Sequence, residues 1–108
     1  MITIDDFKKI EIRVGEILSS EKIEGSEKLL KLSVHFGEEN PRTVLSGISP
    51  YFSDITVLVG KKCAFVTNLE PRPMMGLESQ GMILATGGET DFTLFEVPAA
   101  TPRGSLVK

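Results

Sequence analysis

The stretch IEIRVGEIL, residues 10–18, decides the fold. Ile10, Ile12 and Val14 alternate with charged residues, which is the period of a strand with one buried face. The alternation breaks at Gly15, and the next two apolar residues are adjacent, so that both faces of the strand become apolar. A glycine at such a break predicts a bulge or a sharp bend, the device that curls a small sheet.

Five further runs have the composition of strands and are separated by turn residues; they are residues 30–36, 42–48, 62–69, 79–86 and 92–97. Residues 50–60 fit a helical turn or a strand equally well and are interpreted as a connection. Residues 70–76 contain two prolines and are interpreted as a loop, because each proline removes a donor from a strand. Short strands in this number indicate a β-sandwich or a small barrel. The bend at Gly15 favours an all-β, five-stranded OB-fold barrel.

Length and composition exclude several classes of protein. With 108 residues, the chain is expected to form a single domain, residues 1–108, with one core and no second lobe. A single cysteine, Cys63, and a single histidine, His35, exclude a disulfide framework and a His/Cys zinc site. No apolar run approaches the roughly 20 residues of a membrane span, and the acidic start MITIDD is unlike a signal peptide. We therefore expect a cytoplasmic protein without a metal, a cofactor or a membrane partner.

The charge of the chain limits how it can bind nucleic acid. Acidic residues outnumber basic ones, and the net charge is −3. A protein that attracts nucleic acid over its whole surface relies on many lysines and arginines. Any such site is therefore expected to be local, with a few cations combined with shape.

No pattern of residues predicts catalysis. Ser79 lies two residues before Gly81, as in a nucleophile elbow, but Leu77 replaces the first glycine and no helical pattern follows. The only available base, His35, lies on the polar face of a predicted strand. Cys63 has apolar neighbours and is interpreted as an inert core thiol. We expect no catalytic residue and therefore no enzyme.

The segment EPRPMMGLESQGM, residues 70–82, has the composition of a binding loop. Its prolines make it stiff, its glycines allow a partner to approach closely, and its methionines offer polarizable surface. Asn68, Arg72, Ser79 and Gln80 add hydrogen-bonding groups that suit bases and phosphates. The alternative interpretation is a barrel corner whose methionines only plug the end.

Several motifs resemble the tRNA-binding domain family, in the family's order and over nearly the whole chain. They are IRVGEI at 12–17, SEKLLKL at 26–32, RTVLSGI at 42–48, VGKK at 59–62 and NLEPRPMMGLESQGMILA at 68–85. The family includes a free-standing bacterial tRNA-binding protein and the C-terminal domain of many methionyl-tRNA synthetases. The resemblance implies an all-β, five-stranded OB-fold barrel with short N-terminal and C-terminal extensions. It also implies binding of tRNA or other structured RNA by shape, as a homodimer or as a partner of methionyl-tRNA synthetase. CsaA-type chaperones are related, so that a peptide-binding module remains the alternative.

The resemblance also implies which residues contact RNA. Lys28 matches the lysine of the family's (D/E)-K-L motif, and Asn68, Pro71, Gly76, Ser79, Gly81 and Met82 match its N-L-x-P…G…S-x-G-M motif. The expected binding face comprises Lys28, Lys31, Arg42, Asn68, Arg72, Ser79, Gln80 and Met82. The sequence departs from the family at Glu70, Pro73 and Met75, which stand where the family usually has cations. Arg72 is therefore the one cation that remains in this loop. Fewer cations predict weaker binding to phosphates.

Apolar residues near both ends of the chain predict self-association. A barrel of this size has difficulty burying them alone, and soluble monomers avoid an exposed apolar patch on an edge strand. The expected dimer interface comprises Phe7, Ile10, Leu94, Phe95 and Val97, with residues 92–108 as a C-terminal dimerisation extension.

Overall fold

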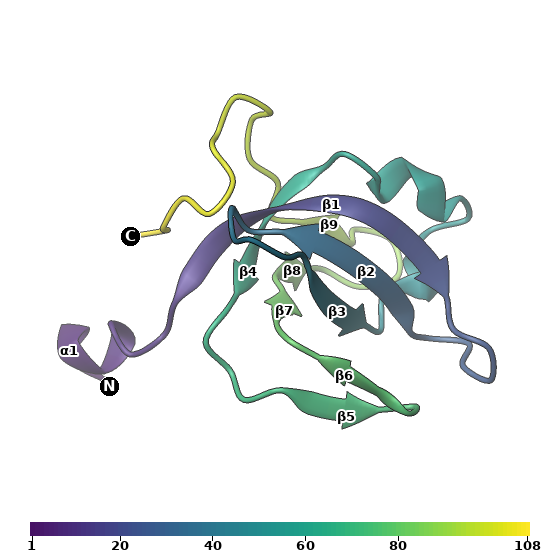
Figure 1. Ribbon diagram of the computed structural model, residues 1–108, viewed down its shortest axis with the longest axis horizontal. Helices are drawn as coiled ribbons and strands as arrows, with labels where there is room; N and C mark the ends of the chain where they lie inside the picture. Colours follow the sequence, from purple (N-terminus) through teal and green to yellow (C-terminus); the bar gives the residue numbers. More distant parts are fainter.

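The central sheet of the computed structural model, which describes residues 1–108, is antiparallel and has the strand order β3-β2-β1-β4-β7. Its strands are β1 (Ile12–Lys22), β2 (Leu30–His35), β3 (Arg42–Ser46), β4 (Lys62–Val66) and β7 (Met82–Ile83). The long β1 curves across the molecule, and the sheet curls into a nearly closed five-stranded barrel of the OB type (Figure 1). The expected fold class is therefore confirmed.

The curvature of β1 has a different origin from the one predicted. The register with β2 shifts between Ile17 and Ser19, so the bulge lies at Leu18 and the prediction of a bulge at Gly15 is wrong. Gly15 instead allows close packing: a Cβ there would lie 2.5 Å from Cγ1 of Val34 and 2.6 Å from Cε1 of Phe36.

The core lies inside the barrel and follows the alternation of β2. Leu30, Leu32 and Val34 are fully buried, and Phe36 packs edge-on against Phe65 with ring centroids 5.2 Å apart. Cys63 is also fully buried, and desolvation raises the pKa of its thiol to about 11. The thiol is thus protonated and unreactive at neutral pH, as the sequence predicted.

Three short helical turns complete the connections. The single-turn 3₁₀ helices η1 (Ser49–Tyr51) and η2 (Ile55–Leu58) occupy the segment that was interpreted as a connection. Helix α1 (Ile4–Phe7) was not predicted, because four residues are too few for periodicity to show. It begins with a capping box in which Thr3 and Asp6 bond each other's backbone. None of these helices is long and apolar enough to cross a membrane.

The second half of the chain is divided more finely than predicted. Strands β5 (Arg72–Met74) and β6 (Leu77–Ser79) form a two-stranded hairpin, and β8 (Ala85–Thr86) pairs with β9 (Thr93–Leu94). The loop predicted for residues 70–76 is therefore partly a strand, and the single strand predicted for residues 79–86 is three pieces. Pro73 is tolerated because the hairpin has free edges, where the missing donor is not needed.

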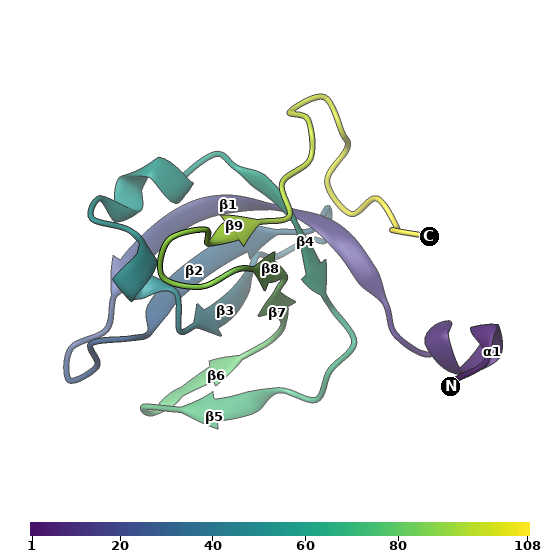
Figure 2. The ribbon, with the colours of Figure 1, turned by 180° about the vertical axis from the view of Figure 1, so that it is seen from behind.

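The C-terminal segment returns to β1 and extends the sheet. The N–H of Val14 donates to the Ser105 carbonyl (2.9 Å), and the N–H of Val107 donates to the Ile12 carbonyl (2.9 Å). The segment thus lies beside the first half of β1, at the edge that β2 occupies along the second half. Both ends of the chain consequently lie at the same end of the molecule (Figures 1 and 2).

Candidate nucleic-acid interface

The β5–β6 hairpin extends from the barrel as an arm (Figures 1 and 2). Its turn, Met75-Gly76, has positive φ at both residues (51° and 77°), which is the geometry of a type I′ turn. Residues 69–78 make no hydrogen bond to the rest of the chain outside the hairpin's own ladder. The arm is therefore held mainly at its two ends, residues 67–68 and residues 79–81.

The tip of the arm touches the loop between β1 and β2. A Cβ added to Gly25 in that loop would lie 3.4 Å from Cε of Met75. The same loop carries Lys28, which is exposed, and β2 continues to the half-buried Lys31. Arg72 on β5 is exposed and makes no ion pair within the chain. We call the surface formed by the hairpin, the β1–β2 loop and the outward face of β2 the hairpin face.

Ser79, one of the predicted binding residues, is enclosed by the protein. It is 2% exposed, and its hydroxyl accepts the N–H of Leu45 (3.0 Å) and donates to the carbonyl of Gly81 (3.1 Å). A side chain so placed cannot contact a ligand. Its neighbour Gln80 is exposed, but its Oε1 accepts the N–H of Thr43 (3.0 Å).

Arg42, also predicted to bind RNA, is occupied by bonds within the chain. Its guanidinium donates to both carboxylate oxygens of Glu38 (2.9 and 2.8 Å) and to the carbonyl of Thr67 (2.7 Å). It also lies 5.3 Å from the centroid of the Phe36 ring. The hydrogen bonds between the two side chains raise the pKa of Arg42 and lower the pKa of Glu38. The side chain thus connects three parts of the chain, and few of its N–H groups are free to bind a ligand.

Asn68 uses both ends of its carboxamide to hold the N-terminal segment. Its Oδ1 accepts the N–H of Glu11 (2.8 Å), and its Nδ2 donates to the carbonyl of Lys9 (2.7 Å). Hydrogen bonds from Arg13 and Thr67 lower the pKa of Glu11, so that its carboxylate stays charged beside this junction.

The eight predicted residues therefore divide into two groups. Arg42, Asn68 and Ser79 are engaged within the chain, as is the side-chain oxygen of Gln80. The remaining four have free functional groups on or beside the hairpin face; they are Lys28, Lys31, Arg72 and Met82. Met75, which the predicted set omitted, is 53% exposed and joins them at the tip. Its departure from the family pattern was the available signal.

The predicted dimer residues also divide. Phe7, Ile10 and Phe95 are 45%, 46% and 50% exposed, whereas Val97 is half-buried. Leu94 is 7% exposed and belongs to the core, so its assignment to an interface is wrong. The sequence placed bulky residues on both faces of the last strand, and Leu94 lies on the face that packs inward.

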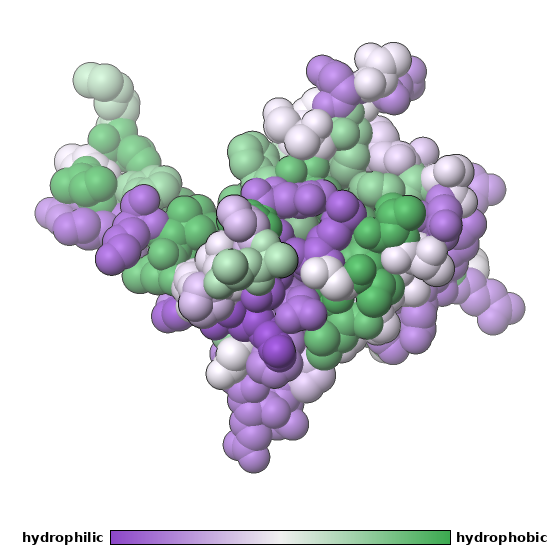
Figure 3. All heavy atoms as spheres, turned by 90° about the horizontal axis from the view of Figure 1, so that it is seen from above, coloured by the Kyte–Doolittle hydropathy of each residue, from purple (hydrophilic) through white to green (hydrophobic).

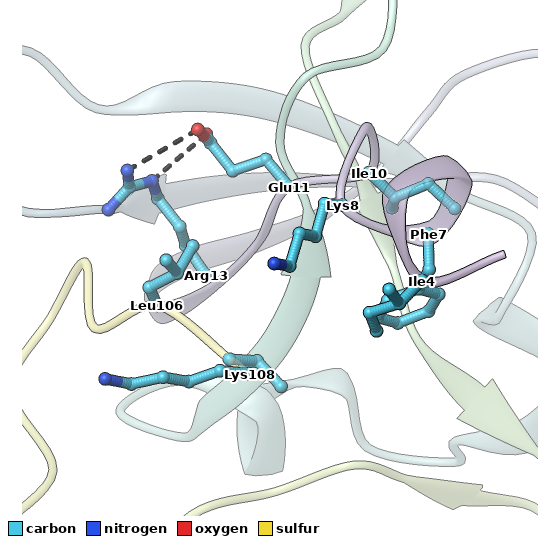
Figure 4. Close-up of a pocket in the computed structure, with 9 residues that line it drawn as sticks. Ile4, Phe7, Lys8, Ile10, Glu11, Arg13, Leu106 and Lys108 are labelled. Atoms are coloured by element: carbon cyan, nitrogen blue, oxygen red, sulfur yellow. Dashed lines mark hydrogen bonds and ion pairs between the residues drawn. The ribbon is translucent and has the colours of Figure 1, made fainter.

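An apolar groove lies between helix α1 and the C-terminal segment (Figure 4). It has a volume of about 420 Å³. Its apolar walls are Ile4, Phe7 and Ile10 from one end of the chain and Leu106 and Val107 from the other. Figure 3 shows hydrophobic residues gathered on the N-terminal segment, which projects from the barrel. Ile4 was not predicted, whereas Leu106 and Val107 lie within the predicted C-terminal extension, residues 92–108.

No group of three or more histidine, cysteine, aspartate or glutamate side chains is arranged to hold a metal ion. What the hairpin face offers is cationic and polarizable: ammonium and guanidinium groups for phosphates, and methionines against which a base can lie. Nucleic acids meet OB barrels on the face of strands 2 and 3 and at the neighbouring loops, the region where the hairpin face lies. Fold and site together define an OB-fold nucleic-acid-binding module.

Comparison with known proteins identifies the family. The tRNA binding domain family matches residues 12–106, and the chain belongs to that family. The chain is 47% identical over 106 residues to the methionine–tRNA ligase of Caldanaerobacter subterraneus subsp. tengcongensis and 45% identical over 107 residues to that of Methanocella arvoryzae. These matches cover 98% and 99% of the chain but 16% and 15% of the ligases. The family is a binding domain and not a catalytic one, so the chain is a non-catalytic tRNA-binding domain.

Solved structures agree with this assignment. The MetRS related protein from Pyrococcus horikoshii superimposes with a TM-score of 0.91 at 38% identity, covering 100% of this chain and 98% of that one. The CsaA chaperone protein from Picrophilus torridus superimposes with a TM-score of 0.86 at 27% identity, covering 100% of both chains. The same barrel thus occurs in proteins named for two different roles.

Proposed function

We propose that this domain binds tRNA on its hairpin face on behalf of a methionyl-tRNA synthetase, in the cytoplasm. The observation that carries the proposal is that three cations on this face, Lys28, Lys31 and Arg72, form no ion pair within the chain and so have free charged groups. The other three arginines are all paired with carboxylates. The methionine–tRNA ligases, which contain a similar domain, support the choice of synthetase.

Binding of this kind relies on phosphates and shape. Each phosphate neutralised by a cation contributes a slope of about −0.7 to −0.9 to the logarithm of the affinity against the logarithm of salt concentration. Three free cations therefore predict a total slope of about −2 to −3. The carboxylates of Glu24 and Glu27 in the β1–β2 loop, and of Glu70 and Glu78 on the hairpin segment, oppose phosphates, so the affinity is expected to be modest.

Fluorescence anisotropy with bulk tRNA over a salt series tests the proposal. The expected result is saturable binding with the slope given above, and weaker binding to a DNA duplex of equal length. Equal affinity for tRNA and duplex DNA would contradict recognition by shape. Undetectable tRNA binding at low salt would contradict the assignment of the face.

We propose further that the apolar groove binds a second copy of the chain. Helix α1 has four residues and none of them is buried, so the barrel alone contributes little to its stability. Burying its apolar side chains about a two-fold axis removes an exposed patch that a soluble monomer would avoid. A dimer also carries two hairpin faces on one body, so that a large folded RNA can be held at two places.

Sedimentation or light scattering at micromolar concentration measures this association. A dimer is expected for the unmodified chain and a monomer for Phe7→Glu, which places a charge in the groove. Val57→Glu is the matched control, because Val57 on η2 is 49% exposed and outside the groove. A monomeric unmodified chain would overturn the proposal.

Peptide binding is the second candidate function. The hairpin face presents Met75 and Met82, which are 53% and 38% exposed, and methionine-rich surfaces adapt to varied apolar side chains. The similarity to a CsaA chaperone protein also favours this candidate. Apolar contact is insensitive to salt. A peptide that competes with tRNA for the hairpin face and binds equally well at low and high salt would therefore support this second function.

A further inference from the structure

The free edge of β3 is closed by side chains in place of a strand. On one side, β3 pairs with β2 along residues 42–46. On the other side, no strand continues the ladder, although the N–H groups of Thr43 and Leu45 point that way. Unpaired backbone donors are costly where water is excluded, so such an edge requires other acceptors.

Two consecutive residues at the end of β6, Ser79 and Gln80, provide these acceptors. Oε1 of Gln80 accepts the N–H of Thr43 (3.0 Å), and the N–H of Gln80 donates to the Thr43 carbonyl (2.8 Å). The hydroxyl of Ser79 accepts the N–H of Leu45 (3.0 Å). Gln80 thus bonds both backbone groups of Thr43, as an opposing strand residue would.

This clasp, formed by Ser79 and Gln80 on Thr43 and Leu45, fixes one end of the arm. The other end is fixed at Thr67 and Asn68, which bond Glu11 and Lys9. The guanidinium of Arg42 joins both ends, donating to the carbonyls of Thr67 (2.7 Å) and Gln80 (3.3 Å). Because residues 69–78 make no outside hydrogen bond, the direction of the arm depends on these fixed ends and on the contact of Met75 with the β1–β2 loop.

We propose that Gln80 is a positioning residue, which holds the β5–β6 hairpin against β3 and so places Arg72 for contact with tRNA. This inference rests on the proposed function of the hairpin face. Gln80 then acts through its hydrogen bonds to Thr43, and not through the direct contact with RNA that its place in the predicted binding face implies. Without the clasp the hairpin still forms, but it samples a wider range of directions relative to the barrel.

Two substitutions separate the clasp from direct contact. Gln80→Met keeps the length of the side chain and removes the acceptor. Gln80→Glu keeps an oxygen acceptor for the Thr43 N–H and removes the amide donors. Because Gln80 is exposed, both variants are expected to fold, and an unchanged thermal midpoint confirms this.

NMR without any ligand measures the clasp and the direction of the arm. In Gln80→Met, the Thr43 amide is expected to exchange at least about tenfold faster, and the residual dipolar couplings of residues 72–79 are expected to shrink relative to the barrel. Gln80→Glu is expected to resemble the unmodified chain in both measurements. The Leu45 amide, held by Ser79, is the internal control and should remain protected in every variant. Unchanged couplings in Gln80→Met would overturn the proposal.

A double-mutant cycle with Arg72→Ala then tests the effect on binding. Gln80→Met is expected to weaken tRNA binding about fivefold where Arg72 is present, the size of one net hydrogen bond, and to have almost no effect in the Arg72→Ala background. Additive losses would mean that Gln80 contacts tRNA independently, which also overturns the proposal. If the unmodified chain does not bind tRNA, the proposed function fails, while the ligand-free measurements still decide whether Gln80 positions the hairpin.

Discussion

Arg72 is the guanidinium that remains free, because Arg13, Arg42 and Arg103 are each paired with a carboxylate. Replacing it by alanine is expected to weaken tRNA binding about fivefold to tenfold and to reduce the salt slope by about one unit. Arg103→Ala is the matched control, because Arg103 pairs with Glu16 at 3.0 Å in the C-terminal segment. Anisotropy measures both variants, and equal losses would show that the hairpin is not the site.

Positive charge can also be added to the hairpin segment by substitution. Glu70→Lys combined with Met75→Arg raises its charge by three, two from the first substitution and one from the second. Met75 already has a positive φ of 51°, and arginine meets the same backbone strain there as methionine, so charge is the main change. We expect tighter tRNA binding and a salt slope steeper by about two units. Glu89→Lys with Val57→Arg adds the same charge away from the hairpin face, and an equal gain from that pair would contradict a local effect.

At this scale the sequence predicted the place of the site better than the roles of its residues. Asn68, Ser79 and Gln80 do belong to the hairpin and its ends. Their partners, however, are backbone groups far away in sequence, with Thr43 lying 37 residues before Gln80. A polar side chain in a loop has the same local signature whether it faces a ligand or a distant strand edge. Only the packed structure distinguishes the two.

Among the elements, β1 requires a residue without a side chain at one position, Gly15. Gly15→Ala would bring a methyl group within 2.6 Å of both Val34 and Phe36, and is expected to reduce the free energy of unfolding by about 2 kcal/mol or more through overpacking. Gly47→Ala is the control, since an added Cβ meets nothing within 4 Å and its φ is not positive. Urea midpoints compare the two, and equal stability would contradict this account of how β1 crosses the core.

The elements that the sequence predicted well are those whose own pattern is decisive. β2 alternates buried and half-buried residues along its whole length, and the pattern is visible in the sequence. The β5–β6 hairpin and α1 were missed for another reason. Three residues per strand and four per helix are too few to show a period, and their stability comes from a turn and a capping box.

For the molecule as a whole, acid is expected to loosen the junction between β1, the β2–β3 turn and the N-terminal segment. Hydrogen bonds from Arg13 and Arg42 lower the pKa values of Glu11 and Glu38 below their ordinary value of 4.5. A carboxyl whose pKa is lowered by folding stabilises the protein above its unfolded pKa, and this contribution is lost as the pH falls through its folded pKa. The free energy of unfolding should therefore decrease from about pH 4.5 downward.

Substitution assigns that decrease to the two carboxylates. Glu11→Gln with Glu38→Gln should flatten the acid limb of the stability curve, because these groups no longer take up protons. Glu89→Gln is the control, since Glu89 forms no ion pair. An acid limb that keeps its slope in the double variant would contradict the assignment.

The carboxamide of Asn68 connects two regions that the proposals treat separately. One side of it holds Lys9 and Glu11, next to the apolar groove, and the other side is the end of the arm that carries Arg72. Ordering one region thus reduces the conformational freedom that the other must lose on binding. Such a link is reciprocal: whatever factor pairing of two chains adds to tRNA affinity, tRNA must add to the affinity of the chains for each other. Taken together, the two proposals therefore predict that the domain pairs most completely where its RNA is abundant.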